Sequence, residues 1–209
     1  MLLITNIQLG RSMMELLGVL AIIGVLSVGS IAGYSKAMLK YKLNNHAQAI
    51  NSLLNNLLQI KDSLPTSNET TLYYADLLRK LNLLPDGITY VSSTTIKDKY
   101  FNINMSPLYY TNKVDGFGEI EIYFGANADH LADVCRNIMF AAKENAANIS
   151  NVQVLRSGGT ANTTRSKIYG DKDCNGKDKK CLSSITLQDT ETFCLGCVNY
   201  TNCKIAIIW

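Results

Sequence analysis

Hydrophobic residues are distributed very unevenly along this sequence. Residues 13–34 are apolar, with glycine and serine interspersed, and hold a single charged residue, Glu15. As a helix this stretch would rise about 33 Å, enough to cross the hydrocarbon core of a bilayer. The pattern therefore predicts a membrane-spanning helix near the start of the sequence.

The helical period continues after residue 34, but the composition changes. Apolar residues recur at helical spacing with asparagine and glutamine between them, and Pro65 ends the pattern. The apolar positions are Leu39, Leu43, Ala47, Ile50, Leu54, Leu57 and Leu64. We expect one helix over 12–62, apolar all round in its first half and amphipathic in its second.

The remaining residues carry the shorter patterns of a globular head. They predict a helix over 73–83, strands over 88–92, 100–105 and 119–124, a helix through 131–139 and a strand over 152–155. Asn127 or Asp129 is the expected N-cap of the second of these helices. Residues 157–182 are typical of an exposed loop, and residues 204–209 of a buried strand, because their apolar character is almost continuous.

The chain length and the net charge limit the possible classes of function. With 209 residues and one membrane helix, the chain has room for one head of ordinary size. The net charge is +3 and the basic residues are scattered. A nucleic-acid-binding protein would show a concentrated basic face, so we expect no specific nucleic-acid partner.

The cysteines indicate the compartment of the head. All six lie in the last 75 residues: Cys135, Cys174, Cys181, Cys194, Cys197 and Cys203. An even number confined to one region is typical of disulfides in an oxidising compartment. A zinc site on Cys174, Cys181, Cys194 and Cys197 is the alternative, but the first pair is spaced more widely than in zinc ribbons. A redox-active Cys194–Cys197 pair lacks the strand–helix pattern that such sites need.

The lysines next to the apolar stretch argue against placing the head in an oxidising compartment. Lys36, Lys40 and Lys42 follow it directly, and by the positive-inside rule they favour a cytoplasmic head. The cysteines favour the opposite orientation, and we give them the greater weight. We expect the head outside the cytoplasm.

The residues before the apolar stretch do not form a typical secretory signal. The leader MLLITNIQLG has no lysine or arginine, the apolar run is too long for a signal core, and Glu15 lies inside it. Gly10, Glu15 five residues later and the uncharged run LLGVLAIIGVL together resemble the N-terminal motif of type IV prepilins.

This resemblance implies processing and assembly roles for three residues. A prepilin peptidase would cut between Gly10 and Arg11 and the new terminus would be N-methylated. Glu15 stands where the family has a glutamate that pairs with the terminal amine of a neighbouring subunit. Arg11 departs from the family, which usually has an apolar first residue, and it lies four residues before Glu15, a spacing at which opposite charges on a helix can meet.

The order of elements resembles the type IVb class of pilins. In that class a cysteine on a helix is bonded to one near the C-terminus, so the resemblance implies that Cys135 joins Cys203 or Cys197. We expect Cys174–Cys181 as a separate, local bridge. The resemblance also implies an α+β fold in which a long N-terminal helix packs on an antiparallel sheet with a disulfide-bonded C-terminal region. The expected divisions are a leader (1–10), a transmembrane and filament-core helix (11–34), its amphipathic continuation (35–64) and the head (65–209).

Two further patterns could carry chemistry. His46 and His130 have no acidic or nucleophilic companions in sequence, which favours packing or surface roles. Asp171, Asp173 and Asn175 alternate ahead of Gly176, as at the start of a calcium loop, but Leu182 stands where the bidentate acid belongs. A solvated loop closed by Cys174–Cys181 is the simpler interpretation, so we expect no metal, cofactor or enzymatic activity.

The sequence thus predicts a structural subunit of a type IV pilus. Its expected partners are copies of itself in a helical filament, the prepilin peptidase, the pilus assembly machinery of the inner membrane and, before assembly, the membrane. The expected location is the bacterial inner membrane and then an extracellular filament. The alternatives are a minor pilin or type II secretion pseudopilin, and a membrane-displayed adhesin whose binding loop lies within 157–202.

Overall fold

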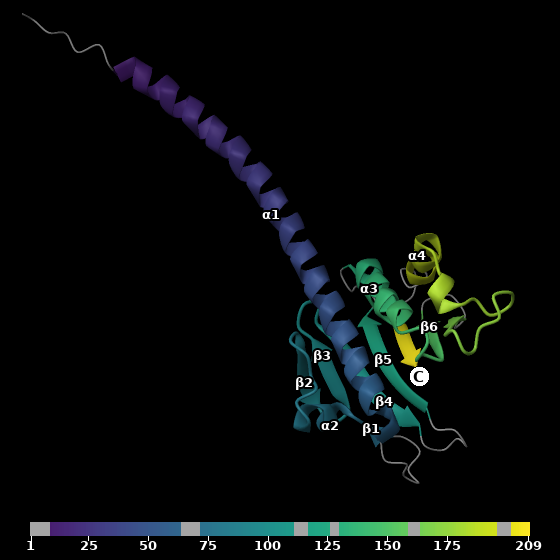
Figure 1. The fold of residues 1–209 in the computed structure, drawn as a ribbon. Coiled ribbons are helices and arrows are strands. Elements are labelled where there is room, and N and C mark those ends of the chain that lie inside the picture. The colour runs from purple at the N-terminus through teal and green to yellow at the C-terminus, as the bar shows by residue number, and fades with distance from the viewer. Residues whose placement is uncertain (1–8, 64–71, 111–116, 126–129, 159–163, 196–201) are drawn as a thin grey trace, which may run out of the picture. The chain divides into compact units, whose positions relative to one another are not determined.

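The protein is described by a computed structural model that covers residues 9–63, 72–110, 117–125, 130–158, 164–195 and 202–209. The chain divides into two compact units, residues 1–41 and 42–209. The long helix α1 (Leu9–Ile60) belongs to both, and a 3-10 turn, η1 (Lys61–Ser63), follows it (Figure 1). The predicted helix over 12–62 is confirmed.

The second unit is built on one antiparallel sheet of eight strands, in the order β2-β3-β4-β5-β8-β6-β7, with β1 paired to β4. The strands are β1 (Leu72–Tyr73), β2 (Ile88–Ser92), β3 (Thr95–Asp98), β4 (Ile103–Tyr110), β5 (Phe117–Gly125), β6 (Asn151–Ser157), β7 (Thr164–Tyr169) and β8 (Asn202–Ile208). The C-terminal strand β8 lies between β5 and β6, so its apolar residues are buried as the sequence predicts.

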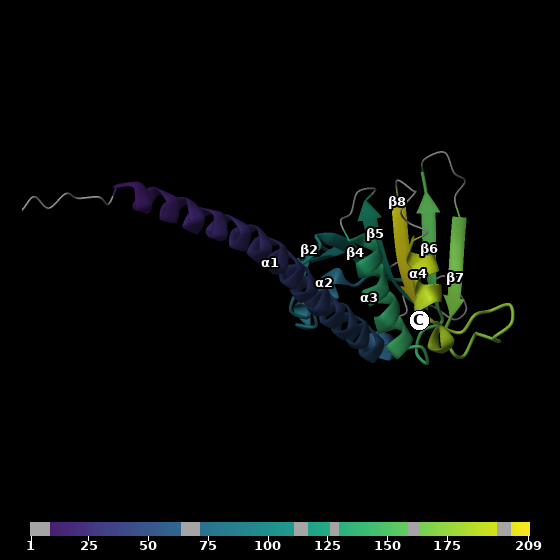
Figure 2. The same ribbon diagram turned by 90° about the horizontal axis from the view of Figure 1, so that it is seen from above.

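Three further helices complete this unit: α2 (Ala75–Lys80), α3 (Leu131–Glu144) and α4 (Leu187–Leu195), with a 3-10 turn, η2 (Leu182–Ser184), before α4. Helices α3 and α4 lie on the same face of the sheet, in front of β5, β8 and β6 in Figure 2. That face forms the core together with residues 49–57 of α1, because Ile120, Ile122 and Val152 are buried there. The predicted α+β class, with a long helix packed on an antiparallel sheet, is confirmed.

Two predicted elements differ from the structure for local reasons. The strand predicted over 100–105 begins only at Ile103, because the Asp98 carboxylate accepts a hydrogen bond from the Phe101 N–H (2.7 Å) and Asn102 takes a left-handed conformation (φ 61°). This turn also separates β4 from β3, a strand that the sequence analysis missed. The helix predicted over 73–83 is shorter, since Leu72 and Tyr73 pair with β4.

The predicted exposed loop over 157–182 is wrong in its middle part. Residues 164–169 form β7, the edge strand beside β6, in which Ile168 is buried while Arg165 and Lys167 are exposed. The N-cap of α3 is His130, in a left-handed conformation and without a side-chain capping bond. The predicted caps Asn127 and Asp129 lie outside the described residues.

Candidate anchoring helix and disulfide-bonded head

The first half of α1 carries apolar side chains that are exposed wherever the structure describes them. In the most apolar window of this helix none of the residues is buried. Its large apolar side chains are 52% to 77% exposed: Met13, Met14, Leu16, Leu17, Val19, Leu20, Ile22, Ile23, Val25, Ile31 and Tyr34. They point to all sides of the helix, so burying them requires a membrane or other protein chains. The helix is long and apolar enough to span a membrane.

The second half of α1 has the opposite environment. Ala49, Ile50, Leu53, Leu54 and Leu57 are at most 3% exposed and belong to the core of the second unit. Asn137 of α3 donates a hydrogen bond to the Leu43 carbonyl (2.8 Å), and Asn51 donates one to the Glu144 carboxylate (2.8 Å). These contacts fix the amphipathic half to α3 through backbone and side-chain groups as well as through apolar packing.

Glu15 lies on the uncovered part of the helix. It makes no hydrogen bond or ion pair with any residue that the structure describes. Gly10 and Arg11 lie in α1, but the side chains before Met13 are outside the description, so the contact between Arg11 and Glu15 stays a prediction. A carboxylate amid apolar side chains is unfavourable in a membrane or a dry interface unless it is paired or protonated.

Small residues leave the backbone of this part of the helix open. A Cβ atom added at Gly18, Gly24 or Gly33 would have no neighbour within 4 Å. Glycines on a membrane helix allow a second helix to approach closely. The same positions therefore offer places where neighbouring helices could pack.

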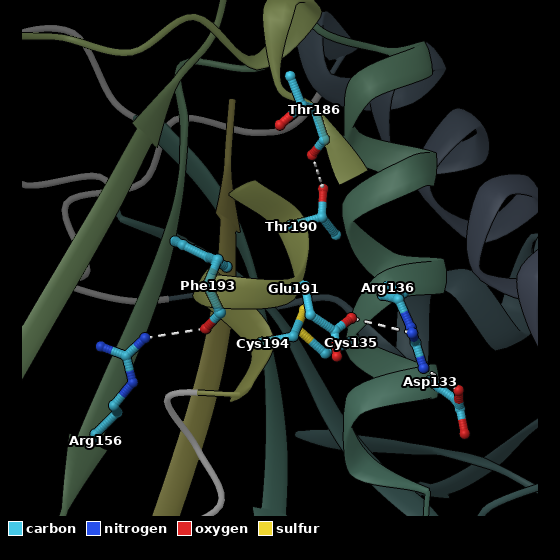
Figure 3. The surroundings of a disulfide bond; sticks show 9 residues. All are labelled: Asp133, Cys135, Arg136, Arg156, Thr186, Thr190, Glu191, Phe193 and Cys194. Carbon is cyan, nitrogen blue, oxygen red and sulfur yellow. Dashed lines mark hydrogen bonds and ion pairs between the residues drawn. A yellow bond between two sulfur atoms is a disulfide. The ribbon is translucent and has the colours of Figure 1, made fainter. Parts of the chain in front are cut away.

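The disulfide Cys135–Cys194 joins α3 to α4, with 5.6 Å between the Cα atoms, and both residues are fully buried (Figure 3). The predicted partner of Cys135, Cys203 or Cys197, was wrong. The sequence analysis did not find α4, which packs beside α3 and carries Cys194 on the side that faces α3. The implied pairing placed the partner close to the C-terminal strand instead, but Cys203 lies within the sheet, opposite Phe124 of β5.

Polar contacts around this disulfide also hold α4 in place. Arg136 pairs with Asp133 on its own helix and with Glu191 of α4 (3.0 Å). Arg156 of β6 donates a hydrogen bond to the Phe193 carbonyl (3.0 Å), and Lys143 donates one to the Ile185 carbonyl (2.8 Å). Figure 3 shows Arg136 and Arg156 on either side of the disulfide. The sequence around Cys194 does not indicate these contacts.

The second bridge, Cys174–Cys181, confirms the predicted local disulfide, with 5.1 Å between the Cα atoms. It closes the loop after β7, where the Tyr169 N–H donates a hydrogen bond to the Lys180 carbonyl. Cys203 is also disulfide-bonded, and its partner lies outside the described residues.

The oxygen atoms of the calcium candidate are used within the protein. Asp173 accepts a hydrogen bond from the Ser150 hydroxyl (2.6 Å), and Asn175 accepts two from the N–H groups of Lys177 (3.0 Å) and Lys179 (2.9 Å). In the described parts of the chain no three histidine, cysteine or acidic residues are grouped so that they could hold a metal. Asp173 and Asn175 thus stabilise the loop, whereas Asp171 contributes its backbone N–H and carbonyl groups.

The two histidines differ in environment. His46 is 1% exposed, lies edge-on to Phe101 and has its Nδ1 atom 3.3 Å from the Asn137 amide nitrogen. Burial lowers the pKa of His46 to about 4, because the charged imidazolium would lose its hydration. His130 lies near Asp133 at the start of α3, with 3.6 Å between the Nδ1 and Oδ2 atoms. Packing explains the first histidine and a surface contact the second.

The strongest features of this chain are therefore an uncovered apolar helix and a head whose C-terminal part is held by disulfides. Neither feature names a family by itself, because long apolar helices and disulfides occur in many extracytoplasmic proteins. Comparison of the chain with models of protein families, with characterised proteins and with solved structures gives no significant match.

Proposed function

We propose that this protein is a structural subunit of a type IV pilus, a surface filament assembled by packing of N-terminal helices. In this proposal the subunit is held in the bacterial inner membrane before assembly and lies in an extracellular filament afterwards. Three features support it: the motif of Gly10 and Glu15, the uncovered apolar helix that follows, and a disulfide-bonded head.

The observation that carries the proposal is the change of environment along α1. The described side chains over 13–25 and 30–34 are exposed, whereas Ile50, Leu53 and Leu57 are buried in the head. In this chain one helix, Leu9–Ile60, contains both the exposed apolar stretch and the residues that pack in the core of the head. A helix that must pack in a filament while its head faces outward requires this continuity.

The proposed assembly uses the residues of the apolar half directly. Cleavage after Gly10 would create an amine at Arg11, and Glu15 of a neighbouring subunit would pair with it. Moving from lipid into a bundle of like helices keeps the apolar side chains out of water, and the glycines let the helices come close. The pairing of charge would set the register between subunits, since an unpaired acid in that environment is costly.

The decisive test is mass spectrometry of the mature protein isolated from the cell that makes it. The expected N-terminus is a methylated Arg11. Gly10→Phe should leave the full-length chain in the membrane, because the peptidase site would not accept a bulky residue. Gly24→Leu is the matched control, since the added side chain has free space and lies far from the cut. An unmethylated N-terminus at Met1 in the wild type would refute the proposal.

A second measurement separates the proposed major subunit from the alternatives. A major pilin should be the abundant protein in filaments sheared from the cell surface, whereas a minor pilin or pseudopilin should be scarce there. The adhesin alternative was placed on residues 157–202, but a deletion would remove β7 and α4 and unfold the head. Replacing the exposed Lys172 and Lys177 by serine is the sharper test: loss of attachment with intact filaments would favour display.

A further inference from the structure

The face of the sheet opposite the helices carries polar side chains, several of which are buried. Along β5, Glu119 and Glu121 alternate with Ile120 and Ile122, so the glutamates point away from the core that the isoleucines enter. We call this surface the outer sheet face. It comprises Glu119, Glu121 and Tyr123 of β5, Lys204, Ala206 and Ile208 of β8, and Asn151, Gln153 and Leu155 of β6.

The strand register places the two glutamates among these residues. Glu119 lies opposite Leu108 of β4 and Ile208 of β8, and Glu121 lies opposite Ser106 and Ala206. Both glutamates are only 7% exposed. Carboxyl groups so deeply buried normally have a cation or several hydrogen-bond donors beside them.

The two glutamates on this face differ in their hydrogen-bond and ion-pair partners. Glu121 pairs with the Lys204 ammonium and accepts a hydrogen bond from the Tyr123 hydroxyl. Gln153 donates to the Asn151 side chain (2.7 Å) and is thereby engaged. Glu119 makes no hydrogen bond or ion pair with a residue that the structure describes. The ammonium nearest to the two carboxyls is thus already committed to Glu121.

The charges that face Glu119 come from few elements. On β5 these are Glu121 and the ionisable Tyr123, on β8 Lys204, and on β7 the exposed Arg165 and Lys167 with Tyr169 further along. The outer-face positions of β4 and β6, which are Asn104, Ser106, Leu108, Asn151, Gln153 and Leu155, carry no charge.

We propose that Glu119 is the proton-sensing group of the sheet: it is neutral when the outer sheet face is closed, and its ionisation loosens the pairing of β5 with β8. When Glu119 loses its proton, the new charge lies beside the charge of Glu121, and the attraction of Lys204 and Arg165 is weaker than this repulsion. Water can reach it only if this part of the sheet opens. The head should therefore be more tightly closed in mildly acidic surroundings than in alkaline ones.

The direction of the effect follows from linkage. Burial, and to a smaller extent the neighbouring Glu121, raises the pKa of Glu119 from 4.5 to about 7. The folded head then binds more protons than the unfolded chain between these values, so stability falls as the pH rises through this window. His46 acts in the opposite sense, because its pKa is lowered to about 4 and its contribution rises with pH up to about 6.5. The wild-type profile alone would hide part of the effect.

The experiment therefore measures a difference between two proteins. The full-length chain in detergent micelles and its Glu119→Gln variant are unfolded at a series of pH values from about 4 to 8, with the fluorescence of the single tryptophan, Trp209, as one readout. Glutamine has the same shape and cannot ionise. The unfolding constant of the wild type relative to the variant should rise with pH by up to about 300-fold, most of it below about pH 7. A ratio that does not change with pH would overturn the proposal.

Glu121→Gln is the matched control, on the same strand and face and equally buried. It should destabilise the head already at acidic pH, because Lys204 loses its ion-pair partner, and should keep most of the pH-dependent fall, because burial of Glu119 is unchanged. If Glu119→Gln does not fold, an NMR titration of the glutamate carboxyl carbons in the wild type tests the proposal instead. A glutamate that titrates near pH 7 supports the proposal, and titration of all glutamates near their ordinary pKa refutes it.

Discussion

Cys135 of α3 and Cys194 of α4 are joined in the core across 59 residues of sequence, and this bridge fixes α4 to α3. The other described bridge, Cys174–Cys181, closes a loop of only 7 residues at the surface. Because a cross-link removes more freedom from the unfolded chain when its loop is long, the two bridges should differ in their effect on stability.

We predict that replacing Cys135 and Cys194 together by alanine lowers the free energy of unfolding by about 4 kcal/mol, and that replacing Cys174 and Cys181 together lowers it by about 2 kcal/mol. Both double variants avoid a free thiol. Urea unfolding of the two variants and the wild type measures the difference. Equal losses, or a larger loss for the surface bridge, would contradict the loop-length argument for this head.

A second prediction concerns acid stability through His46. Its folded pKa, about 4, lies below the ordinary value of 6.5, so its contribution is fully present above about pH 6.5 and is lost as the pH falls toward 4. The loss should amount to at most about 3 kcal/mol. His46→Gln should remove this part of the pH dependence in thermal unfolding. An unchanged profile in His46→Gln would refute the assignment.

The elements with a strong periodic pattern could be predicted from the sequence. The apolar run before Tyr34 and the stripe through Ile50, Leu54 and Leu57 gave α1, and the continuous apolar run near the C-terminus gave β8. These patterns are strong because each residue on one face meets the same environment. Nothing in them, however, indicates that β8 lies between β5 and β6, since strand order depends on contacts between distant residues.

The elements that were missed have weak local patterns. Helix α4 is only nine residues long, and its buried residues Thr190, Phe193 and Cys194 do not form an apolar stripe. Strand β7 carries Arg165 and Lys167 on its outer side and therefore resembled a loop. Without α4 the partner of Cys135 could not be found. Glu119 was missed because alternation of acidic and apolar residues is ordinary for a strand with one face in water.

A third prediction concerns Gly170, at the end of β7. A Cβ atom there would lie 1.6 Å from the Ile149 carbonyl oxygen, which is backbone and cannot move aside easily. Gly170→Ala should therefore displace the turn after α3 and lower the free energy of unfolding by about 1–3 kcal/mol or more. Gly24→Ala is the control, since that Cβ has no neighbour within 4 Å. Chemical unfolding monitored by circular dichroism would measure both, and an unchanged stability of Gly170→Ala would show that the packing there is looser than described.

The last prediction separates two roles for the acid in the apolar helix. If Glu15 pairs with the terminal amine of a neighbouring subunit, Glu15→Leu should give a stable, membrane-inserted protein that no longer enters filaments. The variant helix is more apolar than the wild type, so insertion has no reason to fail, while the intersubunit partner is gone. Membrane fractionation and electron microscopy of sheared material measure the two properties separately.

Arg11→Phe then tests whether the acid depends on its own chain. The amine of residue 11 is present whatever its side chain, so pairing between subunits should persist and filaments should form as in the wild type or better. If instead an Arg11–Glu15 pair within one helix neutralises the acid, this variant leaves Glu15 unpaired among apolar side chains, and assembly should fail although cleavage after Gly10 proceeds. Because the mature N-terminus can be read by mass spectrometry in the same samples, failure of processing and failure of assembly can be told apart. We expect filaments from correctly cleaved Arg11→Phe, and their absence would shift the role of Glu15 from the contact between subunits to the contact within one.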